Sequence, residues 1–210
     1  MTTTGDDLQR LAALAASLRP RFIVGKPLPR LLFVTDPART PDPEAIAARL
    51  PAGWGVIYRA FGAADAPARA AALKAIAIER DLVLLIGADA DLAEACGADG
   101  VHLPERAIAE AARHRERRQD WILTAAAHSP AAATAAHQAG CDAVLASPVF
   151  ASNSPSAGPA MGLARFTAFV REAPLPVYAL GGVNAETASQ LSGSGTQGFA
   201  MVEALTGVRT

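Results

Sequence analysis

The sequence predicts an α/β fold, a single (β/α)8 TIM barrel with an extra N-terminal helix and a short or missing last helix. Eight short apolar runs succeed one another along the 210 residues, with alanine-rich helical stretches between them. The runs begin about 18 to 35 residues apart, the repeat of strand–helix units joined by right-handed crossovers. Continuous apolar runs are typical of parallel strands that are buried on both faces, and eight such units close into a barrel.

The order of the elements supports a single domain. The predicted strands are residues 31–35, 56–59, 82–86, 100–103, 122–126, 143–148, 177–180 and 199–202. Residues 1–30 hold an amphipathic helix over 6–18 and its lead-in, and residues 31–210 form the barrel. The helix is expected to cover one end of the barrel or to contact another subunit of a homo-oligomer. Only residues 203–210 come after the last strand, too few for a long outer helix.

Three similar turns connect helices to strands. Gly97, Gly140 and Gly195 each follow a helical stretch and precede a predicted strand. Glycine at this position is typical of a helix that ends in the left-handed backbone conformation. The repeat therefore indicates fold and carries no information on function.

Composition excludes several classes of protein. Hydrophobic residues make up 51% of the chain, charged residues 19%, and the net charge is −1, which argues against disorder and against nucleic-acid binding. No apolar run approaches 18 residues and the first residues are acidic, so we expect a cytoplasmic protein with no membrane segment. Lys26 and Lys74 are the only lysines, and neither follows a predicted strand, which argues against a Schiff-base mechanism. Cys96 and Cys141 lack metal-ligand spacing and are expected to be structural.

Anion-binding groups come after two of the predicted strands. Arg59 ends the second, where its guanidinium could hold a phosphate or pair with a neighbouring acid. Gly181 and Gly182 come after the seventh, with Asn184 as the expected N-cap of the next helix. Paired glycines let the backbone approach a ligand, and many barrels hold a phosphate at this place.

Two histidines lie at strand ends. His128 comes after the fifth strand, where it could transfer protons or simply bind a loop carbonyl group. His102 lies on the fourth strand and is expected to be structural, because the chain continues directly into the next helix.

Five ordered motifs resemble the thiamine phosphate synthase and TenI family. They are Leu32–Asp36, Gly97–Leu103, Ala127–Ser129, Ser147–Phe150 and Ala179–Val183, within a likeness that extends over residues 31–204. The resemblance implies a barrel that joins a pyrimidine pyrophosphate to a thiazole phosphate with Mg²⁺, or, in the TenI branch, one that tautomerises the thiazole phosphate. Its partner is then a small heterocyclic phosphate.

Several charged positions of the synthase pattern differ in this chain. The Gln-x-Arg-x-Lys pattern keeps only Arg59, and Gly87–Ala88 replaces an Asn-Asp pair, which leaves the adjacent Asp89 as a candidate metal ligand. A later metal-binding aspartate of the pattern is an alanine here, and the serine on the fifth strand is replaced by Ala126. These losses remove carboxylates and a cation that would bind magnesium pyrophosphate.

The loops after the sixth and eighth strands also depart from the family. Ser152 and Ser154 keep the hydroxyls of a Thr-x-Thr-Lys run without its lysine. Glu203 stands where a small or hydroxyl residue is usual, and a carboxylate directed into the phosphate position would repel a dianion.

These residues leave three hypotheses. The first is a thiamine phosphate synthase-like transferase of weakened activity, with Arg59, Ser152, Ser154, Gly181 and Gly182 at the substrate. The second is a thiazole tautomerase that uses His128. The third is a non-catalytic barrel that binds a thiamine-related ligand or a partner protein.

Overall fold

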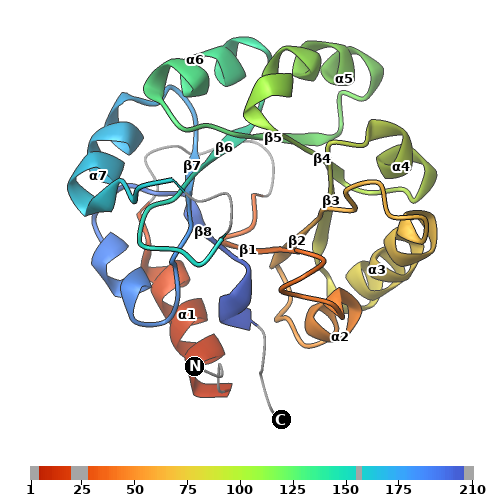
Figure 1. Ribbon diagram of the computed structural model, residues 1–210, viewed down its shortest axis with the longest axis horizontal. Coiled ribbons are helices and arrows are strands. Elements are labelled where there is room, and N and C mark those ends of the chain that lie inside the picture. Colours follow the sequence, from red (N-terminus) through yellow and green to blue (C-terminus); the bar gives the residue numbers. More distant parts are fainter. Residues whose placement is uncertain (1–4, 20–27, 155–157, 206–210) are drawn as a thin grey trace.

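The computed structural model is a closed barrel of eight parallel strands, and it describes residues 5–19, 28–154 and 158–205 (Figure 1). The strands are β1 (Leu31–Val34), β2 (Gly55–Tyr58), β3 (Val83–Gly87), β4 (Gly100–Leu103), β5 (Ile122–Ala126), β6 (Ala143–Ala146), β7 (Val177–Leu180) and β8 (Gly198–Met201). Each pairs with its neighbour in the chain, and β1 pairs with β8 at Leu32 and Ala200 to close the barrel. The predicted fold class is confirmed, with strand ends that differ from prediction by one or two residues.

Helical segments surround the strands. They are α1 (Gly5–Ser17), α2 (Pro43–Ala47), α3 (Ala66–Arg80), α4 (Ala90–Ala95), α5 (Ala111–Arg117), α6 (Pro130–Gln138) and α7 (Gly162–Glu172), with 3-10 helices η1 (Glu105–Glu110), η2 (Thr187–Leu191) and η3 (Glu203–Leu205). Among the described residues, only the single turn η3 comes after β8, in agreement with a short last helix. No helix of the described chain is long and apolar enough to cross a membrane.

The predicted glycine turns are confirmed. Gly97, Gly140 and Gly195 have positive φ angles of 67°, 88° and 79°. An aspartate follows two residues after Gly97 and after Gly140, and each binds the turn to a strand. Asp99 accepts a hydrogen bond from the amide of Leu84 on β3, and Asp142 accepts one from the amide of Leu123 on β5. These groups stabilise the amino-terminal side of the barrel, away from the loops at the carboxyl ends of the strands.

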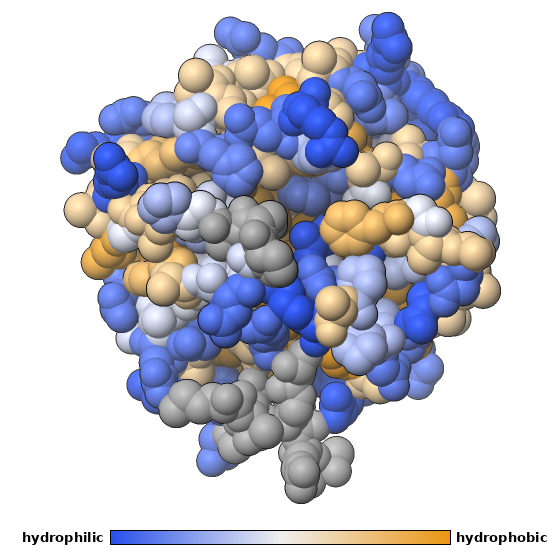
Figure 2. Space-filling model, viewed as in Figure 1, coloured by the Kyte–Doolittle hydropathy of each residue, from blue (hydrophilic) through white to orange (hydrophobic). Residues whose placement is uncertain are grey.

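Apolar side chains fill the barrel and the layer outside it. Alternate residues of the strands point inward and form one buried cluster, which includes Leu32, Ile57, Leu85, Leu145 and Tyr178. The other face of each strand packs against the helices in a larger cluster. This alternation places the first polar residues after each strand around the mouth of the barrel. On the face shown in Figure 2, hydrophilic side chains gather over the centre of the barrel.

The helix α1 lies on the side of the barrel, between η2 and α2 in the outer ring (Figure 1). Its residues Leu11 and Ala15, with Leu18 just beyond it, are buried in the same cluster as Leu191 of η2. Of the two expected positions, cover for one end of the barrel was wrong, and contact with another subunit stays a prediction. Because only a single turn comes after β8 in the described chain, the side of the barrel left uncovered there is available to α1, and burying its leucine face stabilises this position.

Candidate functional site

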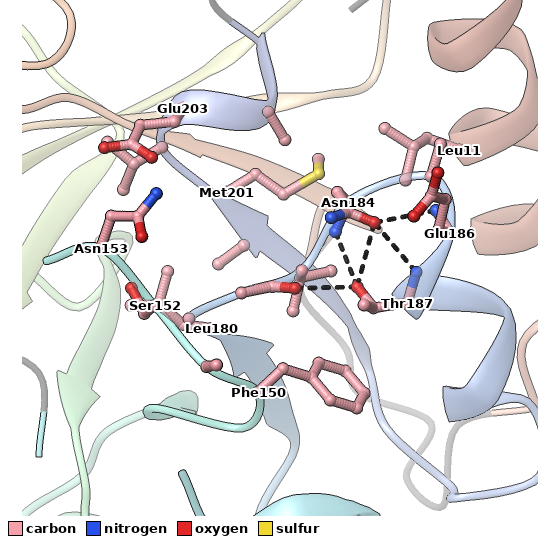
Figure 3. A pocket seen from close by; sticks show the side chains of 18 of the residues that line it. Leu11, Phe150, Ser152, Asn153, Leu180, Asn184, Glu186, Thr187, Met201 and Glu203 are labelled. Atoms are coloured by element: carbon pink, nitrogen blue, oxygen red, sulfur yellow. Dashed lines mark hydrogen bonds between the residues drawn. The ribbon is translucent and has the colours of Figure 1, made fainter. Parts of the chain in front are cut away.

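A pocket of about 460 Å³ opens at the carboxyl-terminal side of the barrel, among the loops after β6, β7 and β8. The loop after β6 supplies Ser152 and Asn153, the turn after β7 supplies Gly181 and Gly182, and Glu203 comes after β8 (Figure 3). Leu11 of α1 completes the wall. The pocket therefore combines the last three strand–loop units with the helix α1.

The Gly181–Gly182 turn requires glycine at both positions. Their φ angles are 89° and 65°, and a Cβ on Gly182 would lie 2.3 Å from the carbonyl oxygen of Ala151 and 2.7 Å from Cβ of Phe150. The backbone therefore passes directly against the loop after β6. Among the described residues, the amides of Gly182 and Val183 have no hydrogen-bond acceptor, and both residues line the pocket.

The turn beyond the two glycines is internally bonded. The side-chain oxygen of Asn184 accepts the amides of Glu186 and Thr187, both at 2.9 Å, and the hydroxyl of Thr187 donates to the carbonyl of Gly182 at 2.8 Å (Figure 3). The side chain of Asn184 thus accepts backbone amides as a capping residue does, but the predicted position was wrong, because η2 begins at Thr187 and its N-cap is Glu186. Because Asn184 already satisfies these amides, the donors that remain are those of the glycine turn.

Arg39 connects the pocket with the loop after β1. Of the described residues that line the pocket, Arg39 alone is basic, whereas Asp7, Glu186 and Glu203 are acidic. Its Nη2 donates to Asp36 at 2.9 Å, and its Nη1 lies 3.7 Å from the carboxylate of Glu203. The hydrogen bond from Arg39 holds the pKa of Asp36 below its usual value. Glu203 thus lines the pocket, as expected, but its charge faces an arginine.

Arg59 is bound to the same aspartate. Its Nε donates to the carbonyl of Thr35 at 2.6 Å and its Nη2 to Asp36 at 3.3 Å. Burial lowers its pKa from the usual value, partly offset by Asp36. The guanidinium also lies 5.3 Å from the ring centre of Phe61. Arg59 therefore forms the ion pair with a neighbouring acid that the sequence left open, and the acid is Asp36. The role of Arg59 as an anion contact stays a prediction.

His102 is partly buried on β4, near the charge of Arg59. Burial, with a smaller contribution from the charge of Arg59, lowers its pKa to about 3. Its Nδ1 lies 3.0 Å from the hydroxyl of Thr124. A neutral ring bonded to a neighbouring strand fits the structural role expected for it.

His128 is exposed at the end of β5. Its Nδ1 lies 2.7 Å from the carbonyl oxygen of Ser147, and its amide donates to Glu105 at 2.6 Å. A carbonyl can only accept, so Nδ1 carries a proton and Nε2 is the nitrogen left to exchange one. The bond to a loop carbonyl is thus present, and proton transfer stays a prediction.

The two aspartates considered for a magnesium ion are each bonded to other groups of the protein. The carboxylate of Asp89 accepts the amide of Leu92 at 2.8 Å and caps α4. That of Asp36 is paired with two arginines. Within residues 5–19, 28–154 and 158–205, no group of three or more His, Cys, Asp or Glu side chains could hold a metal ion. Asp89 as a metal ligand stays a prediction.

The serines after β6 occupy different positions. Ser152 lines the pocket, and its hydroxyl accepts the amide of Ser154 at 3.3 Å. Ser154 belongs to the described residues but not to the pocket lining, and Pro155, Lys26 and residues 206–210 lie outside the described chain.

Four of the predicted site residues meet in one pocket, namely Ser152, Gly181, Gly182 and Glu203. Arg39 lines the same pocket and was missed. The only sequence signal for Arg39 was its place three residues after Asp36, at the end of a predicted strand.

The fold and this pocket define a (β/α)8 barrel with a pocket among the loops after its last three strands. Residues 31–205 match the family described as thiamine monophosphate synthase, and the chain belongs to this family. It is 32% identical to the thiamine-phosphate synthase of Ruminiclostridium cellulolyticum over 63% of either chain. It is 35% identical to a bifunctional thiamine biosynthesis protein of Symbiobacterium thermophilum, over 95% of this chain and 42% of the relative. The chain thus spans less than two thirds of both relatives.

A solved structure supports the same fold. The thiamine phosphate pyrophosphorylase of Pyrococcus furiosus superimposes with a TM-score of 0.73, at 24% identity, over 86% of this chain and 88% of the other. At this identity the likeness concerns the architecture of the barrel.

Proposed function

We propose that this protein acts in thiamine biosynthesis, in the cytoplasm, as a thiamine phosphate synthase-like protein that binds a thiazole phosphate in the pocket after β6 to β8. The observation that carries the proposal is the Gly181–Gly182 turn, whose geometry leaves the amides of Gly182 and Val183 available at the pocket. Successive backbone amides without an acceptor are groups that can bind a phosphate without a charged side chain. The hydroxyl of Ser152 supplies a further polar group to this pocket.

In the transfer reaction, the thiazole nitrogen attacks the methylene carbon of the pyrimidine as the bond to pyrophosphate breaks. Negative charge grows on the leaving group, so the reaction needs cations beside it. Arg59 is the candidate at the barrel centre, and it must share its charge between Asp36 and the leaving group. We therefore expect transfer that is slower than in a synthase with the complete family pattern.

A second candidate function is tautomerisation of a thiazole phosphate. It moves a proton between two positions of the ligand and needs neither pyrophosphate nor its cations. The contact of Nδ1 of His128 with the carbonyl of Ser147 favours it, because this contact leaves Nε2 as the exchanging nitrogen. On this proposal, replacing His128 with alanine abolishes tautomerase turnover.

The test incubates the purified protein with the pyrimidine pyrophosphate, thiazole phosphate and Mg²⁺, and follows thiamine phosphate through its fluorescent oxidation product. The Pyrococcus furiosus enzyme is the positive control. Slow formation supports the transferase, and none excludes transfer under these conditions. Calorimetry with thiazole phosphate is the parallel measurement, and absence of binding would overturn the proposed pocket.

A further inference from the structure

Arg39 and Glu203 form a charge pair that lies in the proposed phosphate pocket. We propose that Arg39 is the cation that holds the phosphate of the ligand. In the absence of ligand, Glu203 forms an ion pair with Arg39, and a phosphate monoester dianion displaces Glu203 when it binds. This inference rests on the proposed function. Arg39 and Glu203 are then the residues that make the pocket prefer a dianionic ligand. Neither the arginine nor the exchange was predicted from sequence.

Asp36 fixes one side of the Arg39 guanidinium. Oδ1 of Asp36 accepts the amides of Ala38 and Arg39, at 3.2 and 3.1 Å, and its Oδ2 accepts Nη2 of Arg39 at 2.9 Å. Arg59 bonds the same Oδ2. An aspartate with this many donors is held in place, so it orients Arg39 toward the pocket without consuming Nη1.

Glu203 holds the other side of Arg39 only loosely. The 3.7 Å separation of Nη1 from Oε1 is an ion pair but exceeds hydrogen-bond distance. Glu203 is also the more exposed partner, with 41% of its side chain accessible against 17% for Arg39. A loose and solvated ion pair contributes little stability, so a ligand can replace it at small cost.

The pocket separates Glu203 from a second glutamate. Figure 3 shows Glu203 and Asn153 at one end and Glu186 beside Leu11 at the other. Among the described residues, the carboxylates that pair with Arg39 are those of Asp36 and Glu203. The two glutamates therefore carry equal charge in one cavity, but only Glu203 competes for the arginine.

This competition favours one class of ligand. A neutral alcohol gains no ion pair with Arg39, and a monoanion only replaces one negative charge with another. A phosphate monoester dianion brings a stronger charge-assisted hydrogen bond to Nη1, and Gly182 and Val183, whose amides have no acceptor among the described residues, line the same pocket. The pair thus selects dianions over the corresponding alcohol or carboxylate.

The experiment measures the affinity for thiazole phosphate and for the thiazole alcohol by calorimetry, in the wild type and in three variants of the full chain. Glu203→Gln removes the competitor and is expected to tighten thiazole phosphate binding about five-fold. Its matched control, Glu186→Gln, removes the same charge from the same pocket and is expected to change it less than about two-fold. Arg39→Gln is expected to weaken it about ten-fold or more, with little effect on the alcohol.

The outcomes separate this inference from the function on which it rests. Equal gains in Glu203→Gln and Glu186→Gln would reflect pocket charge alone and overturn the exchange. Unchanged affinity in Arg39→Gln would also overturn it, provided that circular dichroism shows a folded variant, and Arg39→Met, which also removes the charge, replaces that variant if it does not fold. Binding by Glu203→Gln with none by the wild type would support the exchange. Binding by none of these proteins would overturn the proposed function itself.

Discussion

The two halves of the barrel mouth use their polar groups differently. After β6, β7 and β8, a pocket stays open and the amides of Gly182 and Val183 have no acceptor among the described residues. After β2 and β3, charged side chains bind neighbouring protein groups, as in Arg59 on Asp36 and in Asp89 on its helix amide. A family fold can thus keep one binding pocket while neighbouring charged residues stabilise loops.

Gly182→Val gives the largest expected effect and acts on the open half. Its Cβ would overlap the carbonyl of Ala151, and valine disfavours a φ of 65°. We expect a loss of about 3 kcal/mol in the free energy of unfolding, measured by urea denaturation, together with loss of thiazole phosphate binding.

The control for this variant is Gly53→Val. Gly53 has a φ of 78° but no atom within 4 Å of a built Cβ. It therefore isolates the backbone cost, about 1–2 kcal/mol. Equal losses in the two variants would show that close packing of the turn contributes nothing.

His102→Asn tests the packed half through its pH dependence. The folded pKa of His102 is about 3, whereas the ordinary value is 6.5, so the unfolded chain binds the proton first as the pH falls. Stability is therefore complete above pH 6.5 and is lost between 6.5 and 3, by about 1.4 kcal/mol per pH unit from this group.

We expect the asparagine variant to lack this part of the slope in urea denaturation at about pH 7, 6 and 5. His114→Asn is the control, because that histidine lies on α5 outside the barrel. The same slope in wild type and His102→Asn would contradict the burial of a neutral ring.

Arg59→Gln compares the two arginines on Asp36. It breaks the bond from Nε to the carbonyl of Thr35 and the ion pair with Asp36, so we expect a loss of about 1–2 kcal/mol in unfolding free energy. Thiazole phosphate affinity should fall less than in Arg39→Gln, as calorimetry can measure. A larger fall in Arg59→Gln would place the phosphate at the barrel centre.

Asp89→Ala has the smallest expected effect. Loss of the cap on α4 costs about 1 kcal/mol, and Asp42→Ala, which removes the equivalent cap of α2, should cost the same. Thermal unfolding with and without Mg²⁺ measures both. Stabilisation by Mg²⁺ that disappears in Asp89→Ala alone would identify Asp89 as a metal ligand.

The barrel could be predicted from the sequence because its signals are local. Apolar runs, helix-ending glycines such as Gly97, and the paired glycines after β7 each depend on a few neighbouring residues. Ion pairs depend on residues far apart in the chain. Asp36 pairs with Arg59, which lies 23 residues further along the chain, and Arg39 reaches Glu203 only because β8 closes beside β1.

The position of α1 shows the same limit. Its leucine spacing predicts a helix with one buried face, but not which surface that face covers. The length of the chain after β8 sets that surface, because the described residues there form only η3. The contribution of Leu11 to the pocket could therefore not be predicted from the helix pattern.

The helix α1 and the loop after β8 both line the pocket, although they lie near opposite ends of the sequence. During synthesis, the residues of β8 leave the ribosome after those of the other strands, so the complete pocket can form only when β8 pairs with β1 and α1 packs against the closed side. Such a contact between distant segments forms late in folding, because closing a long loop costs entropy first. A ligand in the pocket therefore binds only the closed barrel and stabilises the pairing of β8 with β1.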